Sequence, residues 1–569
     1  MFDKKTMEQN RTMEQNLREQ MAEIGGEPLK ASTRGGIDLK PSYTPADIDQ
    51  MNYKDISVPG QYPFTRGYRP LQYQTQPWVM RHGRGFGTGA NTRERGDFLE
   101  SLGGAYHVGD SPKEKPFAFT LLLDLPSQCG YDPDVPQARG RVGECGVSIS
   151  NMWDLEDLFG EKKVENTEVI FITPDASLPF IAQYVAYAES HGIPTNKLRL
   201  KSCNLFYHQW FWDSAAFPPE FAMRQGPELI KYLHENVPLA ELQSLTGYNP
   251  GEAGASPAQE LAFTIATGVA IVEECAKVGL KPDDILPHFY AHDHISMDIF
   301  ETVAKFRAKR RMWAKILTEK FGCKNQQALI LRNYPQTGGS FLTAREPENN
   351  IIRATLMTLA AVLAGVDGIW TASYDEALNI PSEPAVKLAI RTHQIIYHES
   401  GVPAVTDPLG GSYYIEWLTN KMEEEANKLL EEIDKRGGYM KCWSDGWFRR
   451  LLIEEARKTH DSTNSCERVV VGENTYVLDE TIPNATFRVD PEVEQKAIDR
   501  VRKFREQRNS EMTEKALIKV RDAAVKIRDE WPDSCGVLMP ALIEAFRAKA
   551  TIGETHNALK EVWGYGYSW

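Results

Sequence analysis

The stretch Glu241–Tyr290 reads ELQSLTGYNPGEAGASPAQELAFTIATGVAIVEECAKVGLKPDDILPHFY and holds one complete β-α-β unit. The apolar runs Glu241–Leu245 and Leu286–Tyr290 predict buried strands. Between them, Ser256-Pro-Ala-Gln259 has the form of a helix-capping box with proline at the first helical position. Gly279 follows the predicted helix Ser256–Val278 and ends it. One face of this helix carries Leu261, Ile265, Val269 and Val272.

The same alternation extends from about Pro116 to Thr406. Further predicted strands are Phe117–Asp124, Val169–Thr173, Leu198–Leu205, Ala328–Arg332 and Gly368–Thr371. Further predicted helices are Leu178–His191, Glu220–His234, Asp298–Phe321 and Asn350–Ala364. Seven or eight such units of roughly 40 residues predict an α/β fold with a closed (β/α)8 TIM barrel. A doubly wound open sheet is the structural alternative.

The regions on either side of the predicted barrel (residues 63–410) have different patterns. Residues 1–62 predict a helical arm before Gly25-Gly26, then an extended wrapping segment. This arm is either a solvated tail or a docking element for another subunit. Residues 411–569 predict a mainly helical region with a β-like piece at Arg468–Leu478. Its predicted helices are Glu416–Arg436, Asp445–Thr459, Val493–Asp529 and Met539–Ala550.

Composition excludes several classes of protein. The 569 residues include 65 Lys and Arg against 79 Asp and Glu, a formal charge of −14, which argues against a nucleic-acid binder. No apolar run approaches the roughly 18 residues that a membrane span needs. The eight cysteines form no C-x-x-C pair, which argues against a zinc ribbon or a disulfide framework. We therefore predict a cytoplasmic protein that binds neither nucleic acid nor membrane.

Two local patterns suggest chemistry without establishing it. Gly83–Gly89 (GRGFGTG) resembles a phosphate-binding loop but lacks the Lys-Ser/Thr ending, so a close backbone approach is the alternative. His292 and His294 share a strand face, where they form either a metal-binding pair or polar lining of a pocket. No G-x-S-x-G or H-E-x-x-H motif occurs. These residues alone predict a large barrel enzyme with a small-molecule substrate.

Short motifs follow one another in a fixed order from about Tyr62 onward. They are Thr65-Arg-Gly, Gln76-Pro-Trp78, Asp124-Leu-Pro126, Gly130-Tyr-Asp132, Gly247-Tyr-Asn-Pro-Gly-Glu-Ala-Gly254, Gln336-Thr-Gly-Gly-Ser, Asn349-Asn350, Asp375-Glu-Ala377, Asp407-Pro-Leu-Gly-Gly-Ser412 and Thr551-Ile-Gly-Glu554. Together they resemble the large, substrate-binding chain of adenosylcobalamin-dependent acyl-CoA mutases, the methylmalonyl-CoA mutase family.

The resemblance implies a barrel that holds a CoA thioester along its axis, with a B12 domain over its mouth. The implied reaction is radical 1,2-migration of the thioester carbonyl group, driven by adenosylcobalamin. The D-x-H-x-x-G motif of the B12 domain is absent from this sequence. We therefore expect no metal ligand here, and a separate small cobalamin-binding subunit that supplies the cobalt ligand and shares the cofactor. A heterotetramer and a G-protein chaperone for cofactor loading complete the expected partners.

The resemblance also implies roles for individual positions. The expected cofactor-binding residues are Gly85, Leu125, Cys145, Glu252, Gly339, Glu376 and Ala377, with Glu252 on the adenosyl ribose. The expected residues at the reacting centre are Gly83, Asn249 and Gln336. The expected substrate and CoA contacts are Tyr73, Gln76, Arg81, Lys201, Cys203, Trp212 and His292.

Departures from the family pattern concern the substrate. Gly83 replaces a tyrosine that covers the substrate, which predicts room for a larger acyl group. Asn249 replaces a histidine and can donate a hydrogen bond, but it cannot act as an acid near neutral pH. Trp212 aligns with the arginine that holds a substrate carboxylate, and Cys203 with a glutamine. Losing a bidentate arginine contact changes the substrate that a site accepts.

These departures predict a bulkier, branched or aryl- or alkyl-substituted acyl-CoA rather than methylmalonyl-CoA. Lys201, His292 or His294 could hold a carboxylate from another direction. The run Leu121-Leu122-Leu123 has no acidic residue, which disfavours 2-hydroxyisobutyryl-CoA without excluding it. The alternatives are an ordinary methylmalonyl-CoA or isobutyryl-CoA mutase subunit, a degenerate CoA-binding barrel without mutase chemistry, and a structural scaffold.

Overall fold

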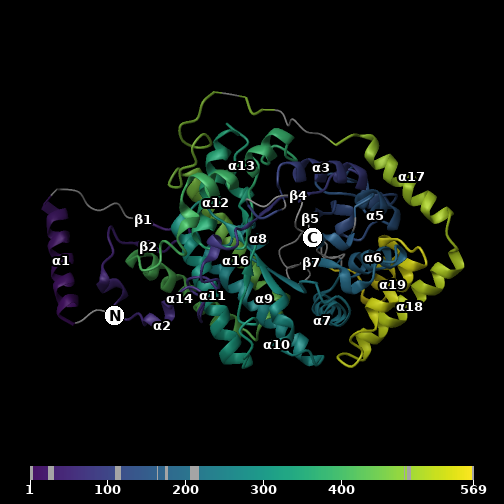
Figure 1. Ribbon diagram of the computed structural model, residues 1–569, viewed down its shortest axis with the longest axis horizontal. Coiled ribbons are helices and arrows are strands. Elements are labelled where there is room, and N and C mark those ends of the chain that lie inside the picture. The colour runs from purple at the N-terminus through teal and green to yellow at the C-terminus, as the bar shows by residue number, and fades with distance from the viewer. Residues whose placement is uncertain are drawn as a thin grey trace.

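A closed ring of parallel strands forms the middle of the protein. The computed structural model describes residues 4–23, 31–104, 106–108, 117–162, 164–173, 177–204, 217–479, 481–483 and 489–566 (Figure 1). Strand β3 (Val79–Arg81) runs on into β4 (Gly83–Arg84). From there, neighbours pair in parallel through β5 (Phe117–Leu122), β6 (Thr167–Thr173) and β7 (Arg199–Asn204).

The second half of the ring uses shorter strands and returns to the first. A parallel bridge between Lys201 and Glu241 leads to β8 (Gln243–Thr246). Next come β9 (Phe289–His292) with β10 (His294–Ile295), β11 (Arg332–Asn333) with β12 (Gln336–Thr337), and β13 (Gly368–Trp370). Gly368 pairs with Val79, so eight strand positions close on themselves. The predicted TIM barrel is confirmed, and the open-sheet alternative is wrong.

Helices cover the outside of the ring. The long ones are α3 (Gly89–Ser101), α6 (Ser177–Ser190), α7 (Pro219–Asn236), α9 (Pro257–Lys277), α11 (Ile299–Phe321), α12 (Asn349–Leu363) and α13 (Glu383–Glu399). The short ones are α2 (Tyr53–Ile56), α4 (Leu125–Gln128), α5 (Met152–Phe159), α8 (Tyr248–Glu252) and α10 (Pro282–Ile285). At α9 the predicted capping box is present, because Ser256 and Gln259 each receive the other's backbone N–H.

Several boundaries differ from the prediction. The predicted strand Ala328–Arg332 is wrong for its first four residues, because Ala328 and Leu329 pack in the core and β11 begins only at Arg332. The run Leu286–Tyr290 starts as a 3-10 turn, and β9 begins at Phe289. In Arg468–Leu478 the structure forms one isolated bridge, between Val471 and Thr475, instead of a strand.

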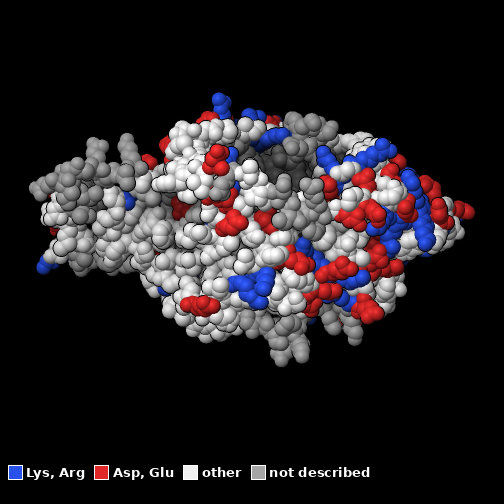
Figure 2. Space-filling model, turned by 90° about the horizontal axis from the view of Figure 1, so that it is seen from above, with Lys and Arg blue, Asp and Glu red and all other residues white. Residues whose placement is uncertain are grey.

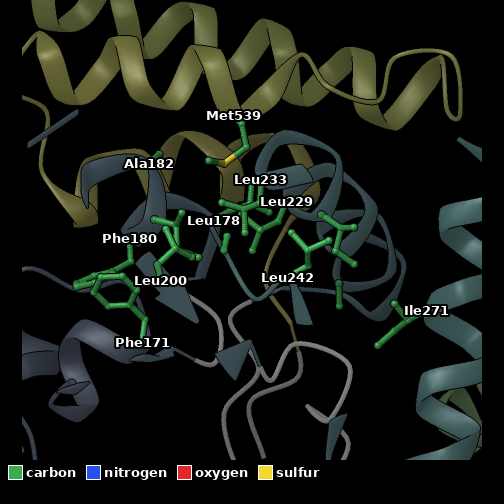
Figure 3. Close-up of a cluster of buried hydrophobic side chains, with 14 of the residues drawn as sticks. Phe171, Leu178, Phe180, Ala182, Leu200, Leu229, Leu233, Leu242, Ile271 and Met539 are labelled. Carbon is green, nitrogen blue, oxygen red and sulfur yellow. The ribbon is translucent and has the colours of Figure 1, made fainter. Parts of the chain in front are cut away.

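The C-terminal region is helical as predicted. It consists of α14 (Tyr413–Lys435), α15 (Tyr439–Ser444), α16 (Trp447–Asn464), α17 (Glu492–Glu506), α18 (Ser510–Asp529), α19 (Leu538–Arg547) and α20 (Ile552–Trp563). The predicted helix Val493–Asp529 is two helices, because Asn509 caps a new one. Met539 points from α19 toward Leu229 and Leu233 of α7 in a cluster shared with the barrel (Figure 3). The C-terminal helices therefore share a core with the barrel.

The two ends of the long axis are built differently. Helix α1 (Lys4–Glu23) lies at one end, near the short strands β1 (Ala31–Ser32) and β2 (Asp38–Leu39), and α17 and α18 lie at the other (Figure 1). Acidic and basic residues intermingle over the C-terminal end, seen from above in Figure 2. No helix in the described part of the chain has the length and apolar character to cross a membrane.

A buried carboxylate ties the last helices to the loop after β5. Asp132 accepts hydrogen bonds from Arg505 Nη2 (2.6 Å), Thr551 Oγ1 (2.6 Å) and the Gly553 N–H (3.0 Å). These contacts join two of the sequence motifs, Gly130-Tyr-Asp132 and Thr551-Ile-Gly-Glu554. The loop that they hold leads from α4 toward the carboxyl end of the barrel, where the candidate site lies.

Candidate active site

The carboxyl ends of β4 and β5 carry the first group of expected cofactor residues. The segment containing Cys145 lies along both ends: the Val147 N–H donates to the Leu122 carbonyl (2.9 Å), and the Gly87 N–H donates to the Gly143 carbonyl (2.7 Å). The structure thus brings the loops carrying Gly85, Leu125 and Cys145 to one side of the barrel mouth.

Gly85 and Cys145 have distinct local environments on this side. Gly85 has a φ of +153°, and a Cβ atom there would lie 2.1 Å from the Leu122 carbonyl oxygen. A close backbone approach therefore explains this glycine, and the predicted phosphate-loop alternative has no support from its position. Burial, with a smaller effect of Glu144, raises the pKa of the Cys145 thiol, so its neutral form is favoured.

The other side of the mouth brings together Glu252, Gly339 and Glu376. Oε2 of Glu252 accepts the Ser340 N–H at 3.0 Å, and Oε1 lies 2.9 Å from Nε2 of His294. A Cβ atom at Gly339 would lie 3.4 Å from the same carboxylate, so this glycine leaves space beside it. Burial raises the pKa of Glu376 to about 7, and the charges of Asp375 and Glu252 add to this effect.

Tyr248 lies in this second group and was absent from the predicted site. Burial, followed by the charges of Glu252 and Glu376, raises the pKa of its hydroxyl well above the ordinary value. Its ring lies 5.1 Å from that of His292 and 6.0 Å from that of His294, measured between ring centroids. A neutral phenol therefore links the histidines at the carboxyl end of β9 and β10 to the two carboxylates at the mouth.

Deeper in the barrel, Lys201 is held by two carboxylates. Its Nζ lies 3.1 Å from Glu241 and 3.2 Å from Glu168. Burial disfavours the charged amine, but the two carboxylates outweigh it and raise the pKa of Lys201. This cation is therefore already neutralised, which argues against its predicted use as a receptor for a substrate carboxylate.

Arg81 and His292 face the same interior as Lys201. The guanidinium of Arg81 lies over the ring of Tyr334, 3.8 Å from its centroid. His292 places Nδ1 2.8 Å from the Tyr334 carbonyl oxygen, and burial lowers the pKa of its ring to about 4. A neutral imidazole cannot pair with a carboxylate as a cation, so His292 is also a poor carboxylate receptor near neutral pH.

Other predicted contacts fall in different places. Cys203 is buried in the barrel interior, where burial raises the pKa of its thiol. The hydroxyl of Tyr73 donates to the Val366 carbonyl (2.7 Å) inside a hydrophobic cluster, away from the mouth, and Gln76 is exposed before β3. Trp212 lies outside the described residues.

The residues expected at the reacting centre occupy neighbouring elements. Gln336 is nearly buried in β12 and pairs in register with His294 on one side and Trp370 on the other. Asn249 lies on α8, three positions before Glu252, and Ala377 is exposed next to Glu376. The structure therefore places Gln336 and Asn249 at the mouth, on or next to the elements that carry Glu252 and Gly339.

The predicted room above Gly83 is not there. A Cβ atom at Gly83 would lie 1.9 Å from Cη2 of Trp370 and 2.7 Å from Cδ1 of Leu122. The expectation of an open space at this glycine is wrong, because the indole of the adjacent strand β13 fills it. The sequence does not predict this contact, since nothing in Gly368–Thr371 indicates that the Trp370 ring lies against Gly83.

The mouth fits an adenosylcobalamin in its donor set. Each carboxylate oxygen can accept more than one hydrogen bond, so Glu252 retains acceptor capacity for ribose hydroxyls. Gly339 leaves space beside this carboxylate, where a side chain would contact Glu252. Among the described residues, no group of three or more His, Cys, Asp or Glu is arranged to hold a metal ion.

Comparisons with known proteins agree over nearly the whole chain. The family model for methylmalonyl-CoA mutase matches residues 32–565. The large subunit of 2-hydroxyisobutanoyl-CoA mutase from Aquincola tertiaricarbonis is 36% identical, over 94% of this chain and 92% of that one. Methylmalonyl-CoA mutase from Rhizobium meliloti is 33% identical, over 96% and 74%. The mitochondrial enzyme of Homo sapiens is 33% identical, over 95% and 69%.

Proposed function

The chain belongs to the methylmalonyl-CoA mutase family, whose members are isomerases, and from this we propose its more specific role. It is the large subunit of an adenosylcobalamin-dependent acyl-CoA mutase. Its substrate is a bulkier, branched or aryl- or alkyl-substituted acyl-CoA rather than methylmalonyl-CoA. The 2-hydroxyisobutanoyl-CoA mutase relative, which this chain matches over 92% of its length, is itself named as a large subunit. This name supports a partner subunit here.

The ion pairs of the barrel interior support the substrate assignment. Lys201 and Arg332 pair with Glu168 and Glu241, which leaves Arg81 as the one cation of this group without a carboxylate among the described ion pairs. A site that holds a free substrate carboxylate needs a desolvated cation to pair with it. Lys201 is already paired, His292 is neutral, and this proposal assigns Arg81 to the CoA tail, so an uncharged acyl group fits this interior better.

The chain's own residues would position substrate and cofactor. Adenosylcobalamin, when bound, supplies the radical that abstracts a substrate hydrogen. Glu252 would accept hydrogen bonds from the ribose, and Glu376, Gly339, Leu125, Cys145 and Ala377 would face the corrin ring, with Gly85 on the adenosyl side. The amides of Asn249 and Gln336 would donate hydrogen bonds toward the thioester carbonyl without transferring a proton. Arg81 would contact the CoA tail.

The partners follow from the same proposal. A small cobalamin-binding subunit covers the mouth, supplies the cobalt ligand and forms a heterotetramer with this chain. A G-protein chaperone delivers the cofactor. Mass photometry of the co-expressed subunits, with and without adenosylcobalamin, tests this assembly, and a large subunit that stays alone with the cofactor present contradicts it.

The substrate is tested by turnover. The reconstituted enzyme is given methylmalonyl-, succinyl-, isobutyryl-, 2-hydroxyisobutyryl-, isovaleryl- and aryl-substituted acyl-CoA esters. We expect kcat/KM for a branched or aryl ester to exceed that for methylmalonyl-CoA at least about tenfold, as expected for a pocket without a carboxylate partner. A preference for methylmalonyl- or succinyl-CoA contradicts the proposal.

One competing function has a specific observation in its favour. Asn249 cannot supply a proton, which fits a degenerate barrel that binds CoA esters without isomerising them. Spectroscopy separates the two functions. A cob(II)alamin–radical signal on addition of substrate requires the mutase, whereas CoA affinity without that signal indicates the degenerate barrel.

A further inference from the structure

Trp370 and Gly83 meet inside the barrel as a matched pair. Cη2 and Cζ2 of the indole would lie 1.9 Å and 2.3 Å from a Cβ atom at Gly83, so the ring rests directly on the glycine backbone. Any side chain at position 83 would have to displace this ring. The pair therefore depends on one large and one absent side chain on adjacent strands.

The strand register places this ring in the barrel interior. Trp370 on β13 pairs with Arg81 on β3 and with Gln336 on β12. Residues in register on neighbouring strands project to the same face of a sheet, and the guanidinium of Arg81 lies over the interior ring of Tyr334. Trp370, Arg81 and Gln336 therefore share the interior face, near the carboxyl ends of their strands.

Within that interior, the indole lies level with Arg81 and on the mouth side of the Lys201–Glu168–Glu241 ion pairs. Lys201 meets Glu168 and Glu241 near the amino end of the barrel, because Glu168 is the second residue of β6 and Glu241 precedes β8. Trp370 is the last residue of β13 and adjoins Gln336. Its partly exposed face is apolar, and its only polar atom is a single N–H donor.

We propose that Trp370, packed on Gly83, is the specificity-determining wall of the acyl pocket and selects an uncharged acyl group with a branched or aromatic substituent. This inference rests on the proposed function and names the residue that sets its substrate class. An aromatic face gains contact with apolar groups over a large area and offers a carboxylate nothing beyond one N–H. The glycine is required because Cη2 and Cζ2 of the ring occupy the space that a Cβ atom at position 83 would fill.

Calorimetric titration of the full large subunit with CoA esters tests the wall without the cofactor. The probes are acetyl-, isovaleryl-, 3-phenylpropanoyl- and methylmalonyl-CoA. We expect W370L to raise the Kd of isovaleryl- and 3-phenylpropanoyl-CoA about tenfold or more, relative to acetyl-CoA, whose acyl group is the smallest. W370F retains a ring and should give an intermediate shift.

Two further variants test the contact with Gly83. G83A alone should weaken the same two esters, because the new methyl group displaces the indole. In the G83A/W370L double variant the effects should not add, since the alanine no longer meets a ring. W417L is the matched control: Trp417 is half-buried and its ring centroid lies 4.7 Å from that of Tyr43 outside the barrel, so its loss should leave all four affinities unchanged.

The outcomes separate the wall from the reaction. Equal shifts for all esters in W370L, or additive effects in the double variant, would overturn the wall. If the variants show the expected Kd shifts but the reconstituted wild type isomerises none of the esters, the proposed function is wrong and the role of Trp370 in binding is still supported. If the wild type binds none of the esters, both proposals fail.

Discussion

Nε2 of His294 lies 2.9 Å from Oε1 of Glu252, and the Ser340 N–H reaches the other oxygen of the same carboxylate at 3.0 Å. Three loops at the carboxyl end of the barrel therefore converge on one side chain. Ser340 donates to both oxygens of Glu252, through its N–H and, at 3.5 Å, through its hydroxyl, so the position of this carboxylate does not depend on a bound cofactor. A pre-positioned acceptor loses less freedom when its ligand binds.

Replacing Glu252 with glutamine should weaken cofactor use. The amide nitrogen cannot accept a hydrogen bond, so either the N–H or the hydroxyl of Ser340 loses its acceptor and the side chain shifts. We expect the concentration of adenosylcobalamin for half-maximal activity to rise about tenfold for E252Q, the cost of roughly one hydrogen bond. E399Q is the control, because it makes the same change at an exposed glutamate at the end of α13, and an equal effect of E399Q would contradict this account.

Glu376 should make stability depend on pH. Its pKa is raised to about 7 from the ordinary 4.5, so between pH 4.5 and 7 the folded chain holds more protons than the unfolded chain. Raising the pH through this window therefore lowers the free energy of unfolding. E376Q removes this effect. Its free energy of unfolding should match that of the wild type near pH 5 and exceed it by about 1–2 kcal/mol near pH 8.

Urea unfolding at several pH values measures this difference. E348Q is the matched control, because it makes the same change at an exposed glutamate at the start of α12. The interpretation fails if E376Q and the wild type keep a constant difference from pH 5 to pH 8.

Lys201 should contribute to stability more than to substrate choice. In K201M the carboxylates of Glu168 and Glu241 lose their shared cation inside the barrel, which should lower the free energy of unfolding by about 3–5 kcal/mol. The triple variant K201M/E168Q/E241Q should recover much of this loss, because it leaves neither carboxylate without its cation and only the partly exposed Arg332, 4.0 Å from Glu241, loses an ion pair. Urea unfolding checks both values.

The same variant tests whether Lys201 binds a substrate carboxylate. We expect the triple variant to change the Kd of methylmalonyl-CoA and isovaleryl-CoA by similar factors. A selective loss of methylmalonyl-CoA binding would show that this lysine does contact a carboxylate.

Asp132 should hold the C-terminal helices to the barrel. D132A leaves the Thr551 hydroxyl and the Gly553 N–H without their buried acceptor, so we expect a loss of about 2–4 kcal/mol in the free energy of unfolding. Limited proteolysis should then cut first between α16 and α20. D529N, at an exposed ion pair on α18, should leave unfolding and the cleavage pattern unchanged.

Local signals in the sequence predicted most of the fold. The helix after Ser256 was predicted because its cap, its apolar face and its terminating glycine are all encoded within the segment itself. Strand β3–β4 escaped prediction because it contains Arg81, His82 and Arg84, charged or polar residues typical of a loop that here are buried. The apolar run at Ala328 led to the wrong start for β11. Residues packed in the core outside the sheet are as apolar as residues within a buried strand, so composition does not distinguish them.

The site could be predicted only in part. Motif resemblance pointed to Glu252, Gly339 and Glu376, and the structure brings these three together. Contacts between distant segments had no signal in the sequence. Trp370 fills the space that was expected to be open at Gly83, and Glu168 and Glu241 form ion pairs with Lys201. Which side chain fills a vacancy is decided by strand order and register, which a sequence pattern does not specify.

The three hydrogen bonds on Asp132 also set an order for biosynthesis. A nascent chain that has completed all eight strands still lacks Thr551 and Gly553, so the loop that carries Asp132 lacks these two contacts until those residues have been made. A chain that stops between Trp370 and Thr551 would therefore have a complete ring of strands but a loosely held loop at the barrel mouth, and proteases would cut that loop first.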